Sequence, residues 1–203
     1  VRQALGYEGT AMRALLRETI DVLKTSGVQC LVLDKSVHEI KRILGMYEVR
    51  MATDEGRRSL RPGPMARHFL TQRYSPGDIR EMAALLEGEI AAAGFQIRPM
   101  PRRVPEFTAS ERALAARLAD PLTRDELEPR VVHDVDCVAA ILVFRGAHRS
   151  STIEDAGAVF ATSSPLVIRN ARLWWQDDER ETGTEPIVHI RALTNLAWLK
   201  KPK

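Results

Sequence analysis

The stretch VQCLVLDKSVHEIKRIL, residues 28–44, decides the expected fold. Its first six residues are mostly apolar and include β-branched side chains, as in a short strand that is buried on both faces. Ser36 and Glu39 then have the spacing of a capping box, which predicts a helix that opens here and ends at Gly45. A strand, a tight turn and a helix in this order indicate half of a parallel β-α-β unit.

The segments on either side of this stretch alternate between helical and strand patterns. Apolar residues recur at helical spacing over residues 9–26, before the first strand. Further helices are expected over residues 79–93, 131–144, 165–175 and 191–199. Further strands are expected at residues 95–98, 158–161 and 187–190. The alternation predicts an α/β fold in which the four strands lie in one mostly parallel sheet.

The bulk composition is that of an ordinary globular protein, with 44% hydrophobic and 28% charged residues. Its length favours one sizeable domain over residues 1–203. No apolar run approaches the roughly 18 residues that cross a bilayer, and the first residues lack the apolar core of a signal peptide. We therefore expect a cytoplasmic protein that does not enter a membrane.

A helical and loop excursion is expected over residues 50–125, and its first part is basic. Seven arginines outnumber three acids there: Arg50, Arg57, Arg58, Arg61, Arg67, Arg73 and Arg80. Beside a nuclease site such a loop can hold a substrate backbone, since basic side chains neutralise phosphates. The alternative is a solvated surface loop, because charge runs commonly serve solubility.

The candidate chemistry lies in acids near the ends of strands. The chain contains no P-loop, no G-x-G-x-x-G, no H-E-x-x-H and no G-x-S-x-G motif, which removes support for several common enzyme classes. Glu39 follows the strand at residues 28–33, and sites in open α/β sheets form at the carboxyl ends of strands. Its carboxylate suits Mg²⁺ or Mn²⁺, although the same residue also completes the capping box.

Asp134 and Asp136 lie in the helical pattern at residues 131–144. At about 100° per residue they flank the apolar face on opposite edges, so both cannot point into one site. Asp134 shares its edge with Arg145, and an acid with an arginine can line a phosphate site. We therefore select Asp134; the alternative is that these acids are ordinary charges near a helix N-terminus.

At three places the chain resembles the PIN-like nucleases. The matching stretches are LGYEGTAMRALLRETIDVLKTSGVQCLVLDKSVHEIKRIL, HDVDCVAAILVFRG and AVFATSSPLVIRNAR. The resemblance implies a Rossmann-like, three-layer α/β domain with a mostly parallel central sheet. It also implies metal-binding carboxylates at Glu39 and Asp134, which we expect to converge at one edge of that sheet. Thr162 and Ser164 then match the motif after a late strand, with Ser164 where a carboxylate is usual.

The activity implied by this resemblance is a Mg²⁺- or Mn²⁺-dependent endonuclease, with RNA favoured over DNA as substrate. Glu39 and Asp134 would hold the metal, Ser164 would complete the catalytic set, and Thr162 and Arg145 would contact substrate. The strand that carries the family's first Asp is missing before Val1, so we expect an incomplete domain that is inactive by itself. The alternative is a catalytically degenerate module that binds nucleic acid or regulates a partner. For either function, the expected protein partners are a second copy of the chain or an antitoxin-like protein.

Overall fold

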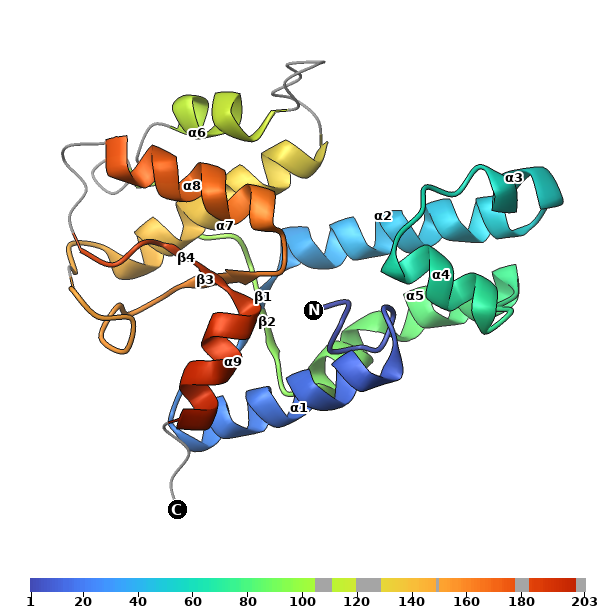
Figure 1. Cartoon of the computed structure of the whole chain (residues 1–203), viewed down its shortest axis with the longest axis horizontal. Coiled ribbons are helices and arrows are strands. Elements are labelled where there is room, and N and C mark those ends of the chain that lie inside the picture. Colours follow the sequence, from blue (N-terminus) through green and yellow to red (C-terminus); the bar gives the residue numbers. More distant parts are fainter. Residues whose placement is uncertain (105–110, 120–128, 149, 178–182, 200–203) are drawn as a thin grey trace. The chain divides into compact units, whose positions relative to one another are not determined.

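The computed structural model describes residues 1–104, 111–119, 129–148, 150–177 and 183–199. The chain is mixed helix and strand and divides into two compact units (Figure 1). Unit 1 comprises Val1–Pro99 with Ala197–Lys203, and unit 2 comprises Met100–Leu196. The sequence favours one domain over residues 1–203, whereas the packing produces these two units.

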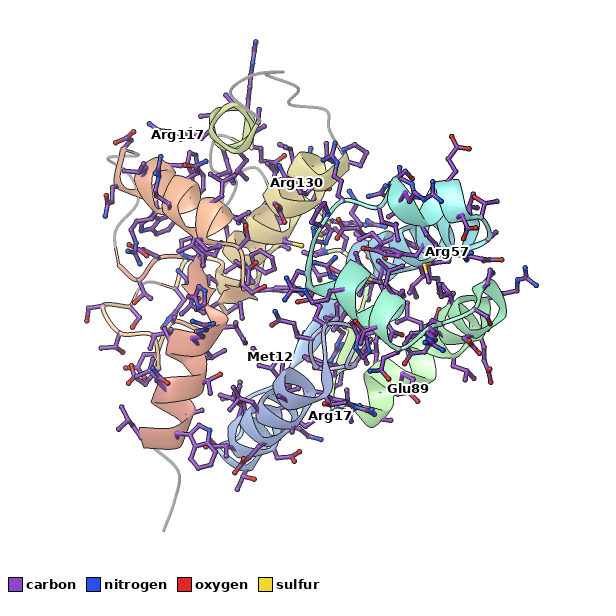
Figure 2. The ribbon with its side chains drawn as sticks, turned by 45° about the vertical axis from the view of Figure 1, so that its right-hand side comes forward. Met12, Arg17, Arg57, Glu89, Arg117 and Arg130 are labelled. Carbon is purple, nitrogen blue, oxygen red and sulfur yellow. The ribbon has the colours of Figure 1, made fainter. Side chains whose placement is uncertain are left out.

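Unit 1 is a set of helices around one short parallel sheet. Its elements are α1 (Thr10–Thr25), β1 (Leu31–Leu33), α2 (Asp34–Met51), α3 (Asp54–Arg58), α4 (Pro64–Thr71), α5 (Pro76–Ala92) and β2 (Gln96–Arg98). One hydrophobic cluster joins α2, α4 and α5, and Phe69, Ile79 and Leu86 are fully buried in it. Arg17 of α1, labelled in Figure 2, donates hydrogen bonds to the carbonyl oxygens of Ala4 and Ala92 and ties α1 to the end of α5.

Helix α2 is longer than the sequence predicts. It begins at Asp34 and continues through Gly45 to Met51, so the predicted start at a Ser36 cap and the predicted stop at Gly45 are both wrong. Tyr47 and Met51 continue the buried face of Ile40 and Leu44 beyond the glycine. Burial of each large apolar side chain contributes about 1.5–3 kcal/mol, which outweighs the roughly 0.5–1 kcal/mol cost of a glycine inside a helix.

Unit 2 is built on a buried central helix. Its elements are α6 (Glu111–Leu118), α7 (Pro129–Arg145), β3 (Phe160–Thr162), α8 (Pro165–Asp177), β4 (Ile187–His189) and α9 (Ile190–Leu199), the last of which ends beyond this unit. Val131, Val138 and Leu142 of α7 pack in one cluster with Trp174 and Trp175 of α8. The helix predicted over residues 131–144 is thereby confirmed.

The four predicted strands exist, but they form two sheets. β1 pairs with β2, and β3 pairs with β4, both in parallel. The prediction of one sheet is therefore wrong for the described residues, which form no central sheet of the three-layer kind. Alternation of strand and helix predicts parallel pairing through helical crossovers, but it does not determine which pairs share a sheet. Among the same residues, no helix has the length and apolarity needed to cross a membrane.

Candidate functional site

Polar side chains meet at the carboxyl end of the β3–β4 sheet in unit 2. Thr162 and His189 are partners in the strand register and are the last residues of their strands. The hydroxyl oxygen of Thr162 accepts from the backbone N–H of Ser164 at 3.3 Å, and Nδ1 of His189 accepts from that of Arg191 at 3.0 Å. Both side chains are partly exposed. They form a polar edge at the place where α/β proteins commonly bind ligands.

Ser164 has a local structural role at this edge. Its hydroxyl oxygen accepts from the backbone N–H of Val167 at 3.4 Å, and Pro165 occupies the first position of α8. This arrangement caps the helix, although the long distance makes the bond weak. A serine hydroxyl in this position can also orient water or a ligand, but it adds no negative charge for a cation. Its predicted catalytic role stays a prediction.

Arg145 holds the other end of the same sheet. Its guanidinium is buried and donates to three carbonyl oxygens: Nε to Ala158 at 2.7 Å, Nη1 to Thr184 at 2.6 Å and Nη2 to Glu185 at 3.0 Å. The acceptors immediately precede β3 and β4. The structure thus gives Arg145 a role in the scaffold, and its predicted contact with phosphate stays a prediction.

The contacts of Arg145 show how α7 runs relative to the β3–β4 sheet. Arg145 is the last residue of α7 and lies beside the starts of the strands, and α7 and β3 run in opposite directions (Figure 1). The eleven residues from Asp134 to Arg145 span about 17 Å at 1.5 Å per residue. The strand path from Ala158 to Thr162 spans about 13 Å. The first turns of α7 therefore lie at the same end of unit 2 as Thr162 and His189.

His133 is the residue of this region that the sequence analysis missed. Its Nδ1 lies 3.3 Å from Oδ1 of Asp134, and its Nε2 lies 3.5 Å from Sγ of Cys137. The signal was present in the sequence, because Cys137 follows His133 by four residues and thus shares its helix face. The imidazole can donate to only one of these two groups when it is neutral. In the tautomer that carries the proton on Nδ1, the imidazole donates to Asp134 and fixes the orientation of its carboxylate.

Asp134 keeps one carboxylate oxygen available. The Asp134 and His133 side chains are 15% and 14% exposed. Within the described part of the chain, Oδ1 of Asp134 has a hydrogen-bonding partner and Oδ2 has none. Because the side chain as a whole is partly exposed, Oδ2 is the oxygen that can take a ligand from solution. Asp134 is therefore the acid in α7 that can still accept a ligand.

Asp136 has different surroundings. Its side chain is 8% exposed, and Oδ1 lies 3.3 Å from Nη2 of Arg103. The same nitrogen lies 2.6 Å from Oε2 of Glu111. One guanidinium thus compensates two carboxylates, as nearly buried acids require. Helical spacing correctly separates Asp134 from Asp136.

Glu39 belongs to unit 1 and not to unit 2. It is the sixth residue of α2, in the second turn, and it is half-buried. The capping-box interpretation is wrong, because the helix begins two residues before Ser36 and a glutamate in the second turn cannot reach the N-cap. The convergence of Glu39 with Asp134 stays a prediction, since the two residues belong to different units.

The donor set fits a divalent cation only in part. Among the described residues, no group of three or more His, Cys, Asp or Glu side chains is arranged to hold a metal ion. Mg²⁺ in phosphate-processing sites commonly uses one or two carboxylates and completes its shell with water and substrate oxygens. The accessible oxygen of Asp134 meets the lower limit of this requirement.

Comparisons with known proteins add no assignment to this edge. No protein-family model, curated protein or solved structure matches the chain.

Proposed function

We propose that the chain is a Mg²⁺- or Mn²⁺-dependent endonuclease domain of the PIN-like type that acts on RNA. The observation that carries the proposal is Asp134, whose carboxylate is oriented by His133 and keeps one accessible oxygen. It lies at the same end of unit 2 as the hydroxyl groups of Thr162 and Ser164. A carboxylate and hydroxyl groups at the carboxyl end of parallel strands are suited to a hard cation and its water ligands.

The proposal rests on Asp134 as the carboxylate of the unit 2 edge and keeps Glu39 as the second predicted metal ligand. A divalent cation supplies polarisation of a phosphoryl oxygen and a water of lowered pKa for in-line attack on a phosphodiester. His133 holds the carboxylate of Asp134 in one orientation. Thr162 and Ser164 orient water or a substrate oxygen. Arg145 has no part in the chemistry, because its guanidinium is committed to backbone carbonyls.

The decisive experiment compares two neighbouring aspartates of α7. We expect Asp134→Asn to abolish Mn²⁺-dependent cleavage of a fluorogenic RNA and to weaken Mn²⁺ binding without unfolding the protein. Asp136→Asn is the matched control, because it lies on the same helix but is compensated by Arg103. Cleavage that survives Asp134→Asn and is lost in Asp136→Asn would refute the assignment. Glu39→Gln tests the carboxylate of unit 1 in the same assay.

A second candidate is a module that binds nucleic acid without cutting it. It is favoured by Ser164, which caps α8 at the position where the family has a carboxylate. With less negative charge, the site attracts a strongly hydrated Mg²⁺ weakly. RNA binding by the wild type and by the Asp134→Asn variant, with no cleavage by either at saturating Mn²⁺, would select this candidate.

A further inference from the structure

Residues 56–77 contain five arginines and no acid. Four of them, Arg58, Arg61, Arg67 and Arg73, are exposed, and we call this set the arginine surface. Within the described part of the chain, none of the four forms an ion pair or a side-chain hydrogen bond. The fifth arginine, Arg57, donates instead to the carbonyl of Met51 and to Asp54. The surface therefore presents four uncompensated charges on one short stretch of chain.

Two members of the arginine surface lie in helices, Arg58 at the end of α3 and Arg67 in α4, while Arg61 and Arg73 lie just outside α4. The helical and loop excursion expected here thus contains two short helices. Met65, Ala66 and Phe69 of α4 belong to the core of unit 1. Phe69 also contacts the ring of Tyr47, with centroids 5.2 Å apart. The packing of α4 into this core holds Arg67 in place, which lowers the entropic cost of binding through that side chain.

Arg73 occupies a position that normally favours glycine. Its φ is 54°, the one positive value among the described non-glycine residues. It ends α4 in a Schellman motif: the N–H of Arg73 donates to the carbonyl of Leu70, and that of Tyr74 donates to Phe69. The rings of Tyr74 and Phe69, 5.1 Å apart, supply the hydrophobic contact of this motif. A strained arginine with no internal partner points to a function for its side chain.

We propose that the arginine surface binds the phosphodiester backbone of a single-stranded nucleic acid. The inference takes its substrate class from the proposed function. Guanidinium groups bind phosphate oxygens in pairs, and a row of phosphates matches several separated arginines. A lipid surface fits less well, because Leu70 is the one exposed large apolar side chain in residues 56–77 and membrane-binding helices need an apolar face.

The surface and Glu39 lie on the same unit, at different ends of α2. α3 follows the last turn of α2, remote from β1 (Figure 1), and the stick view labels Arg57 at this end (Figure 2). The twelve residues from Glu39 to Met51 span about 18 Å along the helix. A strand of several nucleotides covers such a distance. The surface thus adds affinity outside the proposed chemistry.

The test separates binding from cleavage. Binding of a labelled oligouridine of about 12 nucleotides, a length within the site sizes of single-strand binders, is followed by anisotropy in EDTA at several salt concentrations. The test variant is R58Q/R61Q/R67Q/R73Q. The matched control removes the same charge from exposed arginines elsewhere: R13Q/R98Q/R112Q/R169Q.

We expect the test variant to bind about 100-fold or more weakly at low salt, because each lost phosphate contact removes the release of counterions. The slope of log K against log salt should fall by about 3, at roughly 0.7 per contact. Equal losses in the test variant and the control would overturn the proposal. Binding of phosphatidylserine vesicles in place of RNA, lost in the same variant, would also overturn it. Mn²⁺-dependent cleavage is measured separately, so failure of the proposed function is distinguishable.

Arg73→Gly provides a second, opposite readout. Glycine relieves the strain at the positive φ and removes the charge, so we expect Tm to rise by about 2–8 °C while RNA affinity falls about fivefold. A purely structural role for Arg73 predicts no loss of affinity. A variant that is stabilised and still binds RNA like the wild type would contradict the inference.

Discussion

The arginine at the end of α7 and the arginines around α4 are the same residue type in opposite surroundings. Arg145 is buried and donates to three backbone carbonyls of unit 2. Arg58, Arg61, Arg67 and Arg73 are exposed, and none has a polar partner among the described residues of the chain. A guanidinium acts as a scaffold where it satisfies buried carbonyls, and it remains available to a ligand where it does not.

Sequence arguments favoured Arg145 as the phosphate contact because it shares a helix edge with Asp134. They favoured a solvated loop for the arginines of residues 50–77. In the structure Arg145 donates to buried backbone carbonyls, while Arg58, Arg61, Arg67 and Arg73 are exposed, as either a solvated surface or a ligand-binding surface requires. The position of a charged side chain in the sequence thus says little about its role until the groups that it contacts are known.

The largest loss of stability is expected on replacing Arg145. Arg145→Met keeps the length of the side chain but leaves the carbonyls of Ala158, Thr184 and Glu185 without their donor. We expect a loss of about 3–5 kcal/mol in the free energy of unfolding, since each unsatisfied buried acceptor costs about 1–3 kcal/mol and some regain water. Urea unfolding followed by the fluorescence of Trp174 and Trp175 measures it.

Arg145→Lys serves as its control. Lysine keeps the charge but cannot reproduce a planar fork, so its stability should fall between the wild type and Arg145→Met. If Arg145→Met unfolded at the same urea concentration as the wild type, the scaffold role would be wrong and the comparison with the arginine surface would lose its basis.

An intermediate loss of stability is expected on replacing Arg57, which contacts both a backbone carbonyl and an exposed side chain. Nη1 donates to the carbonyl of Met51 at 2.5 Å, while Nη2 pairs with an exposed Asp54. Arg57→Gln should cost about 1 kcal/mol, mainly through the backbone bond, because the exposed ion pair contributes little. Thermal unfolding in low and high salt checks the division: a cost that vanishes in high salt would assign it to the ion pair instead.

The smallest effect on stability is expected within the arginine surface. Arg67→Gln removes an exposed side chain without an internal partner, so the free energy of unfolding should change by less than about 0.5 kcal/mol. The same substitution should weaken RNA binding at low salt and reduce the salt slope by roughly 0.7. Destabilisation by more than about 1 kcal/mol would show that Arg67 supports the fold and would blur the contrast with Arg145.

Local structure was largely predictable. The helices expected over residues 9–26, 165–175 and 191–199 exist within one or two residues, and the strands expected at 95–98 and 187–190 exist within one. These elements follow from apolar periodicity and from the glycine and proline residues at their ends, which act over a few positions of the chain. Periodicity also correctly separated the surroundings of Asp134 and Asp136.

Three features were not accessible in this way. The cap assigned to Ser36 and Glu39 was wrong because α2 begins at Asp34, and the stop assigned to Gly45 was wrong because α2 gains more from the burial of Tyr47 and Met51 than the glycine costs. The partner of Asp134 was not predicted, because the candidate site was built from acids and His133, the preceding residue, was not considered. The partners of Arg145 lie 13 to 40 residues further along the chain, beyond the reach of any helical pattern.

Patterns in the sequence predict where helices and strands form and which acids share a helix face, because these properties depend on neighbours a few residues away. Packing produces the rest: among the described residues the strands form two sheets, Arg145 donates to backbone carbonyls, and four arginines of residues 56–77 have no polar partner. The physical reason is that hydrogen bonding and desolvation depend on atoms brought together by packing. A side chain can bind a ligand only through the polar atoms that have no partner inside the protein.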